Sequence, residues 1–272
     1  MHRSEKRAAS HAGVGEILFP KQQVAHGCLH AGIADRRMWE PQVSPLVAAG
    51  YRVVRCDLRG YGDSPLPPGR FSNVEDVRAL LDELAIDGAT VVGASFGGRV
   101  ALELTLEHPE RVEALVLVGP GLRGIQWSEN IERFGDEEEA LLDAGDVEAA
   151  VELNVRTWVD GPARGPDEVD RGVRDLVATM QRRAFEVQVA VPDAGPDEEP
   201  ERPAADRLGD VRCPTLVVVG DFDQPDILKV VDELAAAIPR ARREIIGGAA
   251  HLPSLEKPEQ FNALLLEFLR VA

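Results

Sequence analysis

Cysteine is scarce in this chain, and the few that occur are not paired along it. Only three of the 272 residues are cysteines, Cys28, Cys56 and Cys213. They are odd in number, widely spaced and set in or near apolar segments, so we interpret them as buried thiols in a reducing compartment. The chain also lacks Cys-x-x-Cys and His-Glu-x-x-His, and its six histidines are scattered. The sequence therefore predicts no metal site.

Positive charge and long apolar runs are scarce as well. The 47 acidic residues outnumber the 30 lysines and arginines, which gives a net charge of -17. Phosphate backbones and acidic lipids would not attract such a surface, so we expect neither nucleic acid nor membrane as a partner. No run approaches the roughly 18 apolar residues of a membrane span, and the first residues lack the apolar stretch of a signal peptide. We expect a cytoplasmic protein, monomeric or homodimeric.

A nucleotide-binding loop is missing too. Gly60-Tyr61-Gly62 is too short and wrongly flanked for a dinucleotide loop, which needs G-x-G-x-x-G at the start of a helix. We therefore predict no cofactor and a small-molecule substrate, for which the sequence names no binding residue.

What the chain does have is an alternation of strands and helices. Strand-like segments at 51–56, 89–92, 113–118 and 215–219 alternate with helical patterns, one of them at 74–84. The run 215–219 is continuously apolar, as in a parallel strand buried on both faces. The order predicts an α/β fold with a mostly parallel sheet flanked by helices.

The middle of the chain follows a different pattern. From 125 to 206 we predict helices only, including one over 167–189, followed by an acidic, proline-rich segment at 192–200 that we interpret as a solvated linker. This insertion is the expected lid of the site. The core would then comprise 28–124 and 207–272, and we regard 1–27 as an atypical N-terminal segment.

The most informative motif is Gly93-Ala94-Ser95-Phe96-Gly97, between a predicted strand and a helical pattern. This G-x-S-x-G arrangement is typical of a nucleophile elbow, a turn so sharp that side chains two positions either side of the serine have no room. Ser95 attacks a carbonyl only if a base takes its proton. Of the six histidines we select His251, because it follows a strand-like run and a loop of small residues.

Several motifs occur together in one order. His30-Ala31-Gly32 is followed by a D-x-R-G-x-G-x-S loop at 57–64, the elbow at Ser95, a Gly-Asp-Phe-Asp segment that ends at Asp223, and His251. With these motifs the chain resembles an α/β-hydrolase of the large esterase, lactonase and carbon-carbon hydrolase group, from Leu29 to Leu269 apart from the variable middle.

The resemblance implies a Ser-Asp-His order and a set of roles. Asp223 is our choice for the acid that orients His251, with Asp221 and Asp226 as competitors. The oxyanion hole would be formed by the N–H groups of Phe96 and Gly32. In the family, the position of His30 mostly braces the oxyanion loop, so we interpret it as structural.

Other polar and aromatic residues receive structural interpretations. We expect Arg59 and Asp63 to pair with each other or with the backbone. Arg99 would face an acidic group of the substrate or form a buried ion pair. Four aromatic residues of the insertion either line the pocket or pack the insertion onto the core, and we favour packing: Trp127, Phe134, Trp158 and Phe185.

One region departs from the family. The strand before His30 is central and buried in relatives, yet here it would contain Gln22, Gln23, His26 and Gly27. We therefore predict that the first strands pair weakly and hold the oxyanion loop imperfectly.

The sequence as a whole predicts a serine hydrolase that cleaves a small carboxylic ester or lactone through an acyl-enzyme. A carbon-carbon bond hydrolase or lyase with the same triad is one alternative, and a noncatalytic ligand-binding relative is another. Relatives that dehalogenate or open epoxides attack with Asp, so the serine disfavours those activities.

Overall fold

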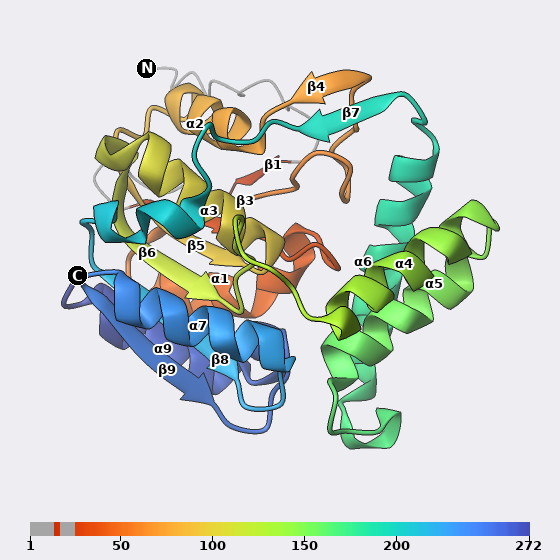
Figure 1. Ribbon diagram of the computed structural model, residues 1–272. Helices are drawn as coiled ribbons and strands as arrows, with labels where there is room; N and C mark the ends of the chain where they lie inside the picture. The colour runs from red at the N-terminus through yellow and green to blue at the C-terminus, as the bar shows by residue number, and fades with distance from the viewer. Residues whose placement is uncertain (1–13, 17–24) are drawn as a thin grey trace, which may run out of the picture.

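The computed structural model describes residues 14–16 and 25–272 (Figure 1). Within these residues the main sheet runs in the order β1-β3-β2-β5-β6-β8-β9, and only β1 is antiparallel to its neighbour. The strands are β1 (Val14–Glu16), β2 (Ala25–Leu29), β3 (Arg52–Cys56), β5 (Ala89–Ala94), β6 (Val112–Val118), β8 (Thr215–Gly220) and β9 (Ala241–Ile246). The predicted mostly parallel sheet is confirmed.

Helices cover both faces of this sheet (Figure 1). One face packs against α1 (Glu40–Ala48), α8 (Pro253–Glu256) and α9 (Pro258–Leu269). The other packs against α2 (Asn73–Glu83), α3 (Phe96–Glu107) and α7 (Pro225–Ala237). Successive strand residues point to opposite faces, so Val91 and Val92 enter different cores. This explains why β5 and β8 are apolar at nearly every position.

The insertion lies between β6 and β8 and stands beside the sheet (Figure 1). Its helices are α4 (Glu129–Asp143), α5 (Val147–Asn154), the π-helix η3 (Val155–Asp160), the short η4 (Pro166–Glu168), α6 (Arg171–Val189) and η5 (Ala204–Asp210). The predicted helix at 167–189 begins later than expected, because Asp170 caps α6 by accepting a hydrogen bond from the N–H of Val173.

The insertion is not helical throughout, and the expectation of a solvated linker at 192–200 is wrong. This segment contains β7 (Ala194–Asp197), which pairs in parallel with β4 (Gly69–Phe71) as a second, two-stranded sheet. The carboxylate of Asp197 accepts a hydrogen bond from the N–H of Asn73 and forms ion pairs with Arg99 and Arg123. These contacts bind the acidic segment to the core.

Strand β2 is regular where weak pairing was expected. Each of its residues is in register with both β3 and β5. The ring of His26 is buried and packs edge-on against Tyr51, 4.5 Å between centroids. Gln22 and Gln23, like most of the segment 1–27, lie outside the described residues.

All three cysteines are free thiols. Cys28 and Cys56 are buried, which raises the pKa of each to about 12, and Cys213 is partly buried. Of the helices in the described residues, none is long and apolar enough to span a bilayer.

Candidate active site

Ser95 occupies a strained turn between β5 and α3. Its backbone angles are φ 49° and ψ -113°, and apart from Ala85 it is the one non-glycine residue with positive φ among those described. Such angles cost of order 1–3 kcal/mol and are concentrated at functional sites. A Cβ on Gly93 would collide with the carbonyl of Gly97, and one on Gly97 with the carbonyl of His30. The glycines leave the space that the elbow requires.

Backbone hydrogen bonds fix this elbow against the end of β6. The N–H of Ser95 donates to the carbonyl of Val118 at 2.9 Å, and the carbonyl of Ser95 accepts from the N–H of Gly121 at 3.0 Å. The serine is thus held at the carboxyl edge of the sheet, where ligands bind in open parallel sheets.

His251 and Asp223 form a buried pair beyond the ends of β8 and β9. Nδ1 of His251 lies 3.0 Å from both carboxylate oxygens of Asp223, and each residue is only 2% exposed. The N–H of Gln224 donates to the same carboxylate at 2.7 Å. Because an ionised carboxylate only accepts, Nδ1 is the ring nitrogen that carries the proton, and Nε2 is the acceptor of the neutral ring.

The competing acids have other partners. Asp221 accepts a hydrogen bond from the N–H of Gly248 at 2.7 Å. Asp226 accepts from both the N–H and the hydroxyl of Ser128 at 2.8 Å. Of the three acids considered from the sequence, the structure brings Asp223 to His251.

The loop that begins at His30 lies against the elbow. A Cβ on Gly32 would be 3.5 Å from Cβ of Phe96, so the two expected oxyanion donors belong to adjacent segments. Nε2 of His30 accepts from the N–H of Leu58 at 2.9 Å, and Nδ1 donates to the carbonyl of Ala31 at 2.8 Å. Burial lowers the pKa of His30. The neutral ring therefore joins two loops, as expected of a brace.

A cleft of about 650 Å³ opens beside Ser95. The insertion contributes apolar side chains to its wall, and the core contributes two arginines. Besides Ser95 and Phe96, the side chains that line it include Trp127, Ile131, Trp158, Arg99 and Arg123. Trp127 and Trp158 thus line the cleft, and both also pack against the core, which was the favoured of the two interpretations. Phe134 packs edge-on against Trp158 and Phe185 is buried, as expected.

Arg99 forms the expected ion pair and also lines the cleft. Its guanidinium lies 4.7 Å from the centroid of the Phe96 ring and 3.0 Å from the carboxylate of Asp197. Arg123 lies 3.3 Å from the same carboxylate. The side chains of Arg99, Arg123 and Asp197 are each 15% exposed. The two arginines that line the cleft therefore share one carboxylate of the protein itself.

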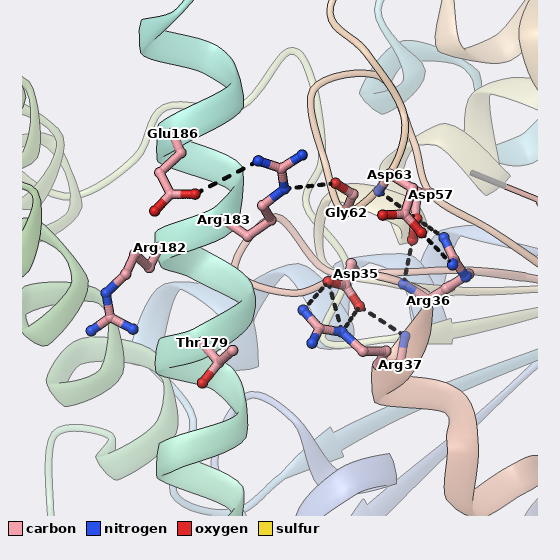
Figure 2. Close-up of a pocket in the computed structure, with 10 residues that line it drawn as sticks. All are labelled: Asp35, Arg36, Arg37, Asp57, Gly62, Asp63, Thr179, Arg182, Arg183 and Glu186. Atoms are coloured by element: carbon pink, nitrogen blue, oxygen red, sulfur yellow. Dashed lines mark hydrogen bonds and ion pairs between the residues drawn. The ribbon is translucent and has the colours of Figure 1, made fainter. Parts of the chain in front are cut away.

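A second cleft, of about 440 Å³, separates α6 from the loops that follow β2 and β3 (Figure 2). Arg59 and Asp63, which we expected to pair with each other or with the backbone, instead pair with other side chains, Arg59 with Asp76 and Asp63 with Arg36. The carboxylate of Asp57 connects the two loops. It accepts hydrogen bonds from the N–H of Arg36, after β2, and from the N–H of Asp63, after β3. These charges stabilise the loops.

A serine on a strained strand-to-helix turn, with a buried His–Asp pair at the ends of later parallel strands, is the arrangement of nucleophile-elbow enzymes. The model of the alpha/beta hydrolase fold family matches residues 28–258, so the chain belongs to this family.

Individual relatives are consistent with this membership. A 2-hydroxy-6-oxononadienedioate/2-hydroxy-6-oxononatrienedioate hydrolase from Cupriavidus pinatubonensis is 31% identical, covering 84% of this chain and 79% of that protein. The structure of an esterase from Thermogutta terrifontis is 26% identical with a TM-score of 0.78, covering 94% of this chain and 92% of the other. An enol-lactonase from Burkholderia xenovorans has the same fold, with a TM-score of 0.74, 24% identity and coverage of 92% of each chain. The protein is an α/β hydrolase.

Proposed function

We propose that the protein is a serine hydrolase with Ser95 as nucleophile, His251 as base and Asp223 as the acid that orients it. The observation that carries this proposal is the buried pair in which Nδ1 of His251 lies 3.0 Å from both carboxylate oxygens of Asp223. This contact leaves Nε2 to accept the proton of Ser95. The strained elbow presents the serine hydroxyl at the same edge of the sheet.

The reaction would proceed through an acyl-enzyme. Ser95 attacks the carbonyl as His251 takes its proton, and the N–H groups of Phe96 and Gly32 donate to the oxyanion. Each donor contributes about 2.7–4 kcal/mol to stabilising this charge. His251 returns its proton to the leaving group and then activates the water that releases the acyl group. No step in this sequence needs a metal or a cofactor.

Small carboxylic esters and lactones are the first substrates to consider. The esterase and enol-lactonase folds are similar to this one, and Trp127, Ile131 and Trp158 give the cleft an apolar wall suited to an acyl or alcohol group.

A carbon-carbon bond hydrolase is the second candidate, favoured by a specific feature of the cleft. Arg99 and Arg123 share the carboxylate of Asp197, so they have the geometry to hold an acidic substrate. The Cupriavidus relative is named for a dienedioate, which carries such groups. Arg99→Met should then raise KM for a 2-hydroxy-6-oxodienoate severalfold and leave KM for a neutral ester unchanged.

Labelling with a fluorophosphonate tests the proposal directly. The adduct is mapped by mass spectrometry in wild type, Ser95→Ala and His251→Ala. We expect labelling of Ser95 that is absent in the first variant and strongly slowed in the second. Turnover of aryl esters, lactones and a 2-hydroxy-6-oxodienoate then identifies the substrate class. A folded protein that takes no label would instead be a noncatalytic, ligand-binding member of the family.

A further inference from the structure

The insertion contacts both loops that carry the His–Asp pair. The carbonyl of Trp158, in the π-helix η3, accepts a hydrogen bond from the backbone N–H of His251 at 3.2 Å. Its indole ring lies 4.6 Å from the imidazole, centroid to centroid. The carbonyl of Thr157 accepts from the side-chain amide of Gln224, next to Asp223, at 2.7 Å. Single π-helical turns are frequent at functional sites.

A buried arginine follows this π-helix and joins it to the loop before His251. The guanidinium of Arg164 donates to the carbonyls of Val159 and Asp160 at 2.7 and 2.9 Å, and to the carbonyl of Gly248 at 3.2 Å. It also forms an ion pair with Glu256 at 2.8 Å, and the two side chains are only 7% and 4% exposed. One arginine thus contacts the insertion, the loop before His251 and helix α8.

The other oxygen of Glu256 completes the connection. It accepts a hydrogen bond from the N–H of Ala250, the residue before His251, at 2.9 Å. Burial raises the pKa of Glu256 and the charge of Arg164 opposes this shift. The carboxylate of Glu256 thus lies between the guanidinium of Arg164 and the backbone of Ala250, next to His251.

The loop needs such support because its own side chains supply none. It consists of Gly247, Gly248, Ala249 and Ala250, and Gly248 has φ +76°. Backbone hydrogen bonds, the carboxylate of Asp221 and the contacts of Arg164 and Glu256 therefore define its conformation.

We propose that Arg164 and Glu256 are positioning residues, an ion pair through which the insertion holds His251 in line with Asp223 and Ser95. This inference rests on the proposed function for its catalytic consequence. The physical reason is that a base displaced by about 1 Å loses up to about a hundredfold in rate.

The test compares Arg164→Met and the nearly isosteric Glu256→Gln with a matched control, Arg207→Met. Arg207 also pairs with a glutamate, Glu107, and donates to a backbone carbonyl, but it joins η5 to the end of α3. Two kinds of measurement are made on each folded variant. The first, which requires no activity, follows His251 by NMR through the resonance of its Nδ1–H and the exchange rate of its backbone N–H. The second is the rate of fluorophosphonate labelling of Ser95 as a function of probe concentration.

We expect Arg164→Met and Glu256→Gln to broaden the Nδ1–H resonance and to speed amide exchange at His251, whereas Arg207→Met does neither. The maximal labelling rate should fall about ten- to hundredfold with little change in the half-saturating concentration. Arg164→Lys, which keeps the charge but not the forked donor, should restore part of the rate.

An unchanged Nδ1–H resonance and unchanged amide exchange at His251 in both Arg164→Met and Glu256→Gln would overturn the proposal. A loss of labelling rate no larger than in Arg207→Met would overturn it as well. A wild type that takes no label would contradict the proposed function, and the resonance and exchange data would still decide whether the pair positions His251.

Discussion

Gly119 lies directly beside Asp223. A Cβ on this glycine would stand 3.1 Å from Oδ2 of Asp223 and 3.2 Å from Nδ1 of His251, and the backbone has φ +48°. Gly119 follows Val118, whose carbonyl accepts the N–H of Ser95. The end of β6 therefore lies between the elbow and the His–Asp pair and sets their separation.

Gly119→Ala should impair labelling of Ser95 by at least about tenfold, since the new methyl group intrudes on the hydrogen bond between His251 and Asp223. The control is Gly135→Ala in α4, where a Cβ would meet nothing within 4 Å. That change should stabilise the helix by about 0.5–1 kcal/mol and leave labelling unchanged. Labelling kinetics and thermal unfolding of both variants decide the matter, and a fully active Gly119→Ala would show that the pair tolerates displacement.

Two replacements of Ser95 should distinguish its role as nucleophile from the backbone strain at its position. Ser95→Ala and Ser95→Gly both remove the nucleophile, so neither should take the label. Glycine adopts positive φ without penalty, whereas alanine retains the strain, so the glycine variant should be more stable than the alanine variant by about 1 kcal/mol. Chemical denaturation measures the difference. Equal stability would mean that the elbow stores no strain.

Glu103 should make stability depend on pH. Burial raises its pKa from 4.5 to about 7, and its side chain is 1% exposed. The folded protein holds this proton more tightly than the unfolded chain. The stability that Glu103 contributes is therefore fully present below pH 4.5 and is lost as the pH rises through 7. The total is at most about 3 kcal/mol.

Glu103→Gln should remove this dependence, so its stability relative to wild type should increase with pH. Urea unfolding at about pH 5 and about pH 8 measures the change. Glu110→Gln, at an exposed position of the short helix that follows α3, serves as the control and should show no such trend. A constant difference between Glu103→Gln and wild type at both pH values would disprove the assignment.

Asp197→Asn should alter substrate preference. The change removes the carboxylate that Arg99 and Arg123 share, so Arg99 becomes available to an acidic ligand, whereas Arg123 keeps Glu103 at 3.4 Å. We expect KM for a 2-hydroxy-6-oxodienoate to fall severalfold relative to a neutral ester, with some loss of stability as β7 loosens. Glu199→Gln, 75% exposed and 3.9 Å from Arg123, is the control. An equal change in KM for the acidic and the neutral substrate would argue against an acid-binding role of the arginines.

Short-range patterns in the sequence sufficed for much of the candidate site. Gly93 and Gly97 flank Ser95 at fixed spacing, and the steric demand of the turn is local, so the elbow could be predicted. The choice of Asp223 over Asp221 and Asp226 rested on the resemblance to the family, and the sequence did not exclude the other two, because all three follow the same strand. Which carboxylate contacts His251 depends on the tertiary structure. Asp221 bonds to the N–H of Gly248 and Asp226 to the N–H of Ser128, which leaves Asp223 for His251.

Contacts between distant segments account for the wrong predictions. β7 was missed because its partner β4 lies over a hundred residues earlier, and a proline-rich acidic stretch gives no strand signal of its own. Arg59 and Asp63 are near in sequence, yet nearer opposite charges, Asp76 and Arg36, come from α2 and from the loop after β2. No local pattern specifies such partners.

By itself the sequence determined the alternation of buried strands and helices, the strained serine and the histidine that follows the last strand. These features depend on hydrophobic periodicity and on the backbone freedom of glycine, which act within a few residues. Only the tertiary structure decided that Asp223 contacts His251, that Trp158 lines the cleft and that Arg164 and Glu256 support the loop before the base. Burial makes those contacts specific, because a buried charge or polar group requires a partner wherever in the chain it comes from.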